Sequence, residues 1–133
     1  MQKVVIDTNI LVSALWSQQG NPYKIARMVF TNEIVPYFDS EIIEEYHEVL
    51  FRPKLNFPKN KVLSLLNEIV KSGVFSEAVV GDTVFTDESD RKFFDMAKAN
   101  GAVLITGNTK HYPNESFVLT PHEFLKKKKG VFL

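Results

Sequence analysis

The segment VVIDTNILVSAL (residues 4–15) determines the fold class predicted for this chain. It begins with Val4–Ile6, a β-branched run of the kind found in strands that are buried on both faces. After Asp7 the periodicity changes, because the apolar residues of 10–15 recur at helical spacing. We therefore expect a short buried strand that passes directly into a helix, with an acid at the junction.

Strands and helices alternate along the rest of the chain. The sequence predicts further strands over 34–38, 77–80, 102–106 and 117–119. It predicts helices over 25–30, 41–50 and 60–72, one that starts at 87–90 and ends at Asn100, and a last one opened by the capping box of Thr120, Pro121 and Glu123. This order is typical of an α/β fold with a parallel sheet covered on both sides, in which ligands bind at the carboxyl ends of the strands. No repeat or linker marks a boundary, so we expect a single domain over 1–133.

Composition excludes several function classes. The chain carries 16 Lys and Arg against 16 Asp and Glu, so its formal net charge is zero, and it has no cysteine. Thiolate catalysis, cysteine metal sites and disulfides are therefore excluded. No apolar run approaches the roughly 20 residues of a membrane span. The start MQKVVIDTN lacks the pattern of a signal peptide, so we expect a cytoplasmic protein with no membrane partner.

Charge is distributed unevenly between the two parts of the chain. Residues 1–50 hold three basic and seven acidic side chains, whereas residues 51–133 hold thirteen and nine. The positive part ends in the lysine run 126–129, which is either the solvated C-terminus of a helix or a contact for phosphates. Charge alone neither requires nor excludes a nucleic-acid partner.

Three acidic residues are predicted to lie at the carboxyl edge of the sheet. Asp7 ends the first strand, where a carboxylate acts as a helix N-cap, is hydrogen-bonded or binds a cation. Glu45 lies between the apolar and solvent faces of helix 41–50, so it either reaches into a cleft or remains an ordinary exposed glutamate. Asp90 faces inward in the first turn of its helix, whose N-terminus we expect to keep it ionised. Asp95 is expected on the opposite, solvent-facing side of that helix.

The loop Thr106–Asn108 adds a fourth candidate. It is either a tight turn or a loop that places Asn108 opposite Asp7. Asp87 is ambiguous between a helix cap and an outer ligand, and His111 follows closely enough to line the wall of the cleft. Clustered carboxylates repel one another without a cation between them. Oxygen ligands without cysteine or histidine favour magnesium or manganese over zinc.

Four segments together resemble one known family. They are VVIDTNILVSAL, EIIEEYHEVLFRPKL, DESDRKFFDMAKANGAVLITGN and the following KHYP. In this order they look like a PIN domain, in the branch described as toxins of toxin–antitoxin pairs, and the resemblance covers nearly the whole chain. It implies a Rossmann-like three-layer sandwich, with a central, mainly parallel sheet flanked by helices. It also implies divalent-metal-dependent ribonuclease activity.

The resemblance implies roles for individual residues. Asp7, Glu45 and Asp90 match the family's acidic positions as catalytic residues and, together with Asn108, as ligands of Mg²⁺ or Mn²⁺; related toxins often have aspartate at the last position. Glu45 would bind a second ion or orient the attacking water. The supporting positions are Thr8, Asn9, Asp87, Thr106 and His111. The implied partners are an RNA substrate, whose backbone Lys54, Lys110 or the terminal lysines could hold, a small antitoxin and a second copy of the chain in a homodimer.

Asn108 favours one alternative function, and Asn9 argues against another. Asn108 removes one negative charge from the expected metal site, which favours a PIN scaffold that holds RNA or protein without cutting it. A phosphatase with a nucleophilic aspartate would require a second aspartate two residues after Asp7, where Asn9 stands. The motifs HExxH, GxGxxG, GxxxxGK[ST] and GxSxG are absent, so zinc proteases, dinucleotide-binding enzymes, Walker-type hydrolases and serine esterases lose support.

Overall fold

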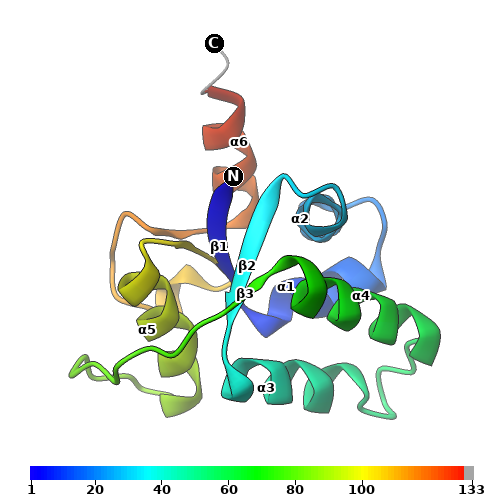
Figure 1. Cartoon of the computed structure of the whole chain (residues 1–133), viewed down its shortest axis with the longest axis horizontal. Coiled ribbons are helices and arrows are strands. Elements are labelled where there is room, and N and C mark those ends of the chain that lie inside the picture. Colours follow the sequence, from blue (N-terminus) through cyan, green and yellow to red (C-terminus); the bar gives the residue numbers. More distant parts are fainter. Residues whose placement is uncertain (131–133) are drawn as a thin grey trace.

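The computed structural model describes residues 1–130 as an α/β fold built around one parallel sheet (Figure 1). The strands are β1 (Gln2–Ile6), β2 (Ile34–Phe38), β3 (Val74–Phe75), β4 (Val103–Ile105) and β5 (Val118–Leu119). The helices are α1 (Thr8–Trp16), α2 (Asn21–Phe30), α3 (Ser40–Leu50), α4 (Lys59–Ser72), α5 (Arg91–Asn100) and α6 (Pro121–Gly130), with short 3₁₀ turns η1 (Glu88–Asp90) and η2 (Thr109–His111). The predicted fold class is confirmed.

The strand order β3-β2-β1-β4-β5 places β1 at the centre of the sheet. Every pairing is parallel: Val4 is in register with Pro36 of β2 and with Val103 of β4. Figure 1 shows α5 on one side of the sheet and α1, α2 and α4 on the other, with α3 below the carboxyl ends of the strands. Loops from several strands therefore meet at that end, where ligands bind in folds of this type.

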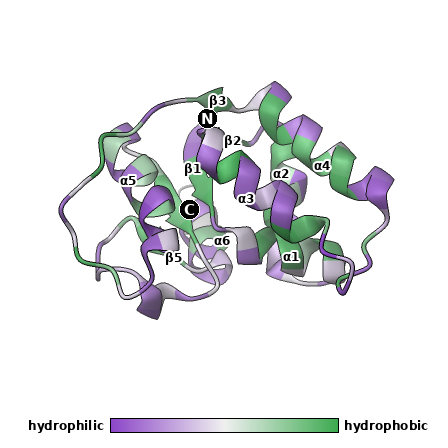
Figure 2. Ribbon diagram, turned by 90° about the horizontal axis from the view of Figure 1, so that it is seen from below, coloured by the Kyte–Doolittle hydropathy of each residue, from purple (hydrophilic) through white to green (hydrophobic). Residues whose placement is uncertain are grey.

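The core confirms the buried strand predicted from the first segment. Val4, Val5 and Ile6 are completely buried, and so is Leu104 of the neighbouring β4. In Figure 2 the ribbon of β1 passes from hydrophilic at its start to hydrophobic, whereas α3 and α4 alternate between hydrophilic and hydrophobic residues, as helices with one buried face do. Within residues 1–130, no helix is long and apolar enough to cross a lipid bilayer.

The strand predicted over 77–80 is wrong. Only Val74 and Phe75 pair with β2, and residues 76–86 form no regular element. Gly73 permits the short β3 because a Cβ at this position would stand 2.4 Å from the carbonyl oxygen of Pro36. A glycine at this point therefore lets the chain approach β2 closely. Val79 and Val80, whose β-branched side chains suggested the strand, are largely exposed.

The last predicted helix starts at the expected capping box and ends in the lysine run. The capping box is confirmed: the amide of Thr120 donates to Glu123 at 2.9 Å, and the amide of Glu123 donates to the Thr120 hydroxyl at 3.1 Å. Lys126 is exposed, in agreement with a solvated helix end, and Lys128 lies 3.9 Å from Glu33. The side chain of Lys129, and residues 131–133 of the domain predicted over 1–133, lie outside the described part of the chain.

Candidate active site at the carboxyl ends of the strands

Asp7 is held at the junction of β1 and α1 by two hydroxyl groups. It occupies the N-cap position of α1, but its side chain makes no capping hydrogen bond. Instead its Oδ2 accepts from Thr106 Oγ1 at 2.8 Å and from Tyr112 Oη at 2.9 Å. The residue is only 8% exposed. The side chain is therefore fixed by the loops after β4, in the place where the fold positions ligands.

Burial raises the pKa of the Asp7 carboxyl above its ordinary value. The hydrogen bonds from Thr106 and Tyr112 act in the opposite direction, and the nearby charge of Glu45 raises the pKa further. The pKa of Tyr112 is raised as well, mainly by burial and by the charge of Asp7, so its hydroxyl remains a donor. The sequence analysis missed Tyr112, although it lies in the quoted KHYP segment; its only signal was its position four residues after Asn108.

Glu45 lies at the border of α3, as its helical position predicted, and both of its oxygens are occupied. Oε1 is 2.8 Å from Lys92 Nζ of α5, and Oε2 accepts a hydrogen bond from Thr8 Oγ1. The side chain is 24% exposed, and that of Lys92 is 13% exposed. The alternative of an ordinary exposed glutamate is therefore wrong. Lys92 was missed because nothing in the sequence pairs a lysine of one helix with an acid 47 positions earlier.

Asp90 ends η1 and stands at the N-cap position of α5 without a capping hydrogen bond. Its pKa is raised, first by burial and then by the charges of Asp7 and Asp87, whereas His111 lowers it. We expected the helix N-terminus to keep Asp90 ionised; burial and the neighbouring carboxylates act against that effect, and the ionised state stays a prediction. The charge of Glu45 also contributes, so the three predicted acids share one electrostatic neighbourhood.

The loop after β4 connects the remaining predicted positions. Thr106 Oγ1 accepts from the amide of Asn108 at 3.1 Å while donating to Asp7. The Asn9 side chain accepts from the amide of Gly107 at 3.1 Å, so this residue positions the loop as expected. Asn108 Nδ2 lies 2.9 Å from His111 Nε2, and His111 Nδ1 lies 3.9 Å from Asp90. This arrangement leaves the Asn108 amide oxygen as the atom suited to a cation.

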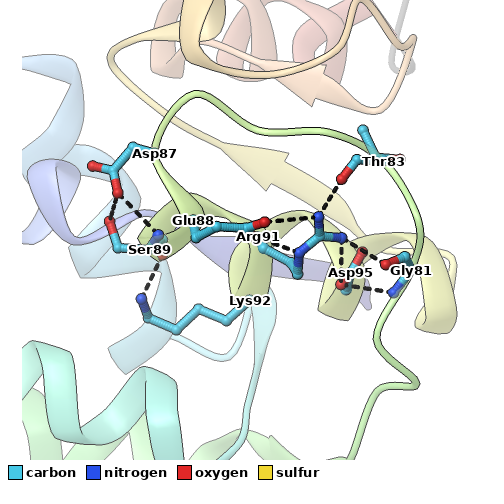
Figure 3. Close-up of polar contacts among 8 residues, drawn as sticks. All are labelled: Gly81, Thr83, Asp87, Glu88, Ser89, Arg91, Lys92 and Asp95. Carbon is cyan, nitrogen blue, oxygen red and sulfur yellow. Dashed lines mark hydrogen bonds and ion pairs between the residues drawn. The ribbon is translucent and has the colours of Figure 1, made fainter.

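Two further acids have structural partners instead. Asp87 caps η1, because its Oδ1 accepts from the amide of Ser89 at 3.0 Å and from its hydroxyl at 2.8 Å (Figure 3). These bonds lower its pKa. Asp95, expected on the solvent side of α5, is only 7% exposed. That expectation is wrong because segment 76–86 crosses this face, where the amide of Gly81 donates to Asp95 at 3.1 Å.

Arg91 attaches segment 76–86 to the start of α5. Its guanidinium donates to the carbonyl oxygens of Gly81, at 2.7 Å, and of Thr83 (Figure 3). It also bonds Glu88 at 2.8 Å and lies 3.7 Å from Asp95. The sequence analysis assigned no role to Arg91, because nothing in the sequence indicates that the irregular segment 76–86 folds back onto α5.

Comparison with known proteins assigns a family to this fold and site. The sequence profile described as PIN domain matches residues 3–110, which include all the predicted site residues except His111. The chain belongs to the PIN-domain family. It is also 35% identical over 109 residues to the uncharacterized protein MJ1680 of Methanocaldococcus jannaschii, a match that covers 80% of this chain and 70% of the relative. PIN domains are associated with nuclease activity and typically bind divalent metals.

The donor set of this PIN domain fits a hard divalent cation only in part. Asp7, Asp90 and the Asn108 amide offer oxygen atoms, which suit magnesium or manganese. Among residues 1–130, however, no three His, Asp or Glu side chains converge as a metal ion requires. Glu45 does not join such a group because its oxygens are held by Lys92 and Thr8. The residues that fit the ion are therefore Asp7 and Asp90, with Asn108 beside them.

Proposed function

We propose that this PIN domain is a divalent-metal-dependent endoribonuclease that hydrolyses RNA phosphodiester bonds. The observation that carries the proposal is the position of Asp7, which is only 8% exposed and lies close enough to Asp90 for its charge to act on that carboxyl. Both carboxyls have raised pKa values, burial is the first cause in each case, and the charge of Asp7 raises the pKa of Asp90. A site that holds two carboxylates in an unfavourable arrangement is typical of functional centres, and a divalent cation would relieve the repulsion.

The chain supplies the geometry for this chemistry. A bound Mg²⁺ or Mn²⁺ would lower the pKa of a water molecule and neutralise charge that develops on the phosphate. Asp7 is held for this purpose by Thr106 and Tyr112, and its partly buried surroundings strengthen its electrostatic interactions. Asp90, at the start of α5, would supply a second carboxylate to the same ion.

A groove next to this centre offers a path for the RNA strand. It has a volume of about 540 Å³, and no acidic residue lines it. Its polar lining residues are Asn9, Ser13, Asn21, Asn108, Thr120 and His122. The absence of acids from this lining would permit a polyanion to approach, and its amides and hydroxyls are of the kind that bond phosphate and sugar oxygens.

The biological setting we propose is that of a toxin. The four sequence segments resemble the branch of PIN domains that act in toxin–antitoxin pairs, and this resemblance supports inhibition by a small antitoxin and assembly as a homodimer. Expression of the wild-type chain would then arrest growth, whereas the Asp7→Asn variant would not.

The proposal is tested by cleavage of a mixed pool of structured RNAs, and of single-stranded DNA, by the purified protein with Mg²⁺ or Mn²⁺. EDTA and the Asp7→Asn variant serve as negative samples, and Asp82→Asn, which changes an exposed acid of segment 76–86, is the matched control. We expect RNA cleavage that requires both metal and Asp7. Cleavage that persists in Asp7→Asn comes from a contaminant, and the absence of any cleavage that requires Asp7 would contradict the proposal.

A second candidate function is supported by Asn108 and by the Lys92–Glu45 pair. Together they reduce the negative charge of the centre relative to four carboxylates. A PIN scaffold whose metal site is weakened in this way would bind RNA or protein without cleaving RNA. Absence of Asp7-dependent cleavage with either metal, together with retained growth arrest by Asp7→Asn, would favour this candidate.

A further inference from the structure

Lys92 projects from the first turn of α5 to Glu45 of α3. Its Nζ is 2.8 Å from Glu45 Oε1, and it also donates to the carbonyl oxygen of Ser89, the contact drawn in Figure 3. The same nitrogen lies 5.0 Å from the centroid of the Phe93 ring, which is within the range of a cation–π interaction. Its side chain is only 13% exposed. Three contacts thus hold this ammonium group in one place, unlike a solvated surface lysine.

Glu45 is correspondingly engaged on both sides. Lys92 contacts Oε1, and Thr8, itself buried, donates to Oε2. A carboxylate that already satisfies an ammonium and a hydroxyl has its charge compensated and its oxygens directed to protein donors. Reaching a metal ion would require it to break a partly buried ion pair, which leaves the lysine uncompensated.

The charges of the centre then favour one ion. Asp7, Glu45 and Asp90 supply three negative charges, and Lys92 pairs one positive charge with that of Glu45. The remaining two negative charges match a single divalent cation. Without the ammonium, the third carboxylate would be free to recruit a second cation.

We infer that Lys92 takes the place of a second metal ion: the centre holds one divalent cation through Asp7 and Asp90, and Glu45 is a positioning residue held by Lys92. This inference deepens the proposed function and rests on it only for the presence of a divalent ion. Asn108 remains beside that ion as a neutral oxygen donor.

The test is the number of Mn²⁺ ions bound per chain, measured by titration calorimetry and by electron paramagnetic resonance of free Mn²⁺. We expect one ion in the wild type and two in Lys92→Met, because Glu45 becomes available. The double variant Lys92→Met with Glu45→Gln removes both charges and should return to one ion, with an affinity within about threefold of the wild type. Lys98→Met, at an exposed position of the same helix, is the matched control and should bind one ion.

A further variant keeps the inference testable if Lys92→Met does not fold. Glu45→Gln leaves the ammonium uncompensated beside the centre, so the single Mn²⁺ should bind roughly tenfold more weakly without a change in stoichiometry. Two ions in the wild type, or no bound ion in the double variant, would overturn the inference and leave the proposed function standing. No Mn²⁺ binding by the wild type would overturn both.

Discussion

Asp7 and Glu45 lie at the same edge of the sheet, yet their surroundings differ in charge. Asp7 is bonded by two neutral hydroxyls, those of Thr106 and Tyr112, whereas Glu45 is paired with the ammonium of Lys92. Neutral donors orient a carboxylate but leave its negative charge. A cationic donor orients the carboxylate and also compensates that charge. The difference separates a carboxylate that remains available to a metal ion from one that has already received a positive partner.

The largest expected effect is the loss of RNA cleavage when Asp90 is replaced, in comparison with Asp87, which lies three residues earlier. Asp90 shares the electrostatic neighbourhood of Asp7, whereas the exposed Asp87 caps η1. Asp90→Asn should reduce metal-dependent RNA cleavage by a factor on the order of 100 or more, as expected when a group that stabilises the reacting charge is removed. Asp87→Asn should retain most of the activity. Initial rates with Mn²⁺ at saturating RNA compare the two; equal losses would place the carboxylate requirement elsewhere.

Much of this edge follows from the sequence by local reasoning. Asp7 ends a buried apolar strand, and the periodicity of α3 places Glu45 at the border of its buried face, so strand and helix geometry predicted both locations. The capping box at Thr120 was predicted in the same way, because its partners are three residues apart. The catalytic and metal-binding roles of these residues stay predictions.

The contacts that could not be predicted join segments that are distant in the sequence. Lys92 pairs with an acid of α3, and Tyr112 reaches back to the end of β1. Asp95 was placed in solvent because a helical wheel contains no information about segment 76–86, which covers it. The raised pKa of Asp90 has the same origin, since burial and neighbouring carboxylates come from the tertiary structure.

Removal of the Tyr112 hydroxyl tests whether the neutral donors hold Asp7 in place. In Tyr112→Phe, the buried Asp7 loses one of its two side-chain donors, and the free energy of unfolding should fall by about 2 kcal/mol, as for a hydrogen bond to a charged group. Urea denaturation in the presence of EDTA measures this. Tyr23→Phe on α2, away from the site, should change the stability by less than about 0.5 kcal/mol. A similar small change in Tyr112→Phe would mean that the hydroxyl does not support Asp7.

Asn108→Asp sharpens the comparison by adding a charge that Lys92 does not compensate. The new carboxylate would lie beside the centre, where Asn108 now contacts His111. Mn²⁺ affinity should rise roughly tenfold, because a cation gains a further negative ligand. Calorimetric titration compares the variant with Asn114→Asp, an exposed asparagine of the following loop. An unchanged affinity would show that position 108 does not face the ion.

The smallest expected effect is a pH dependence of stability in the metal-free protein. The folded pKa of Asp7 is raised above its ordinary value of 3.8, so the native state binds the proton more tightly than the unfolded chain. The contribution of this group to stability therefore declines as pH rises above 3.8 and levels off once pH exceeds the folded pKa. Asp7→Asn cannot titrate and lacks this decline.

The free energy of unfolding of Asp7→Asn, relative to the wild type, should consequently increase between about pH 4 and pH 7 when both are measured in EDTA. Subtracting the two curves removes the contributions of groups whose pKa does not depend on Asp7, including Asp87, whose lowered pKa acts in the opposite direction. The pKa of Asp90 does depend on Asp7, and its change in the variant adds to the same increase. Saturating Mn²⁺ should abolish the increase, because the cation stabilises the ionised carboxylate. A difference that stays constant with pH would mean that Thr106 and Tyr112 offset the burial of Asp7 completely, and the contrast with Glu45 would then lie in the ammonium of Lys92 alone.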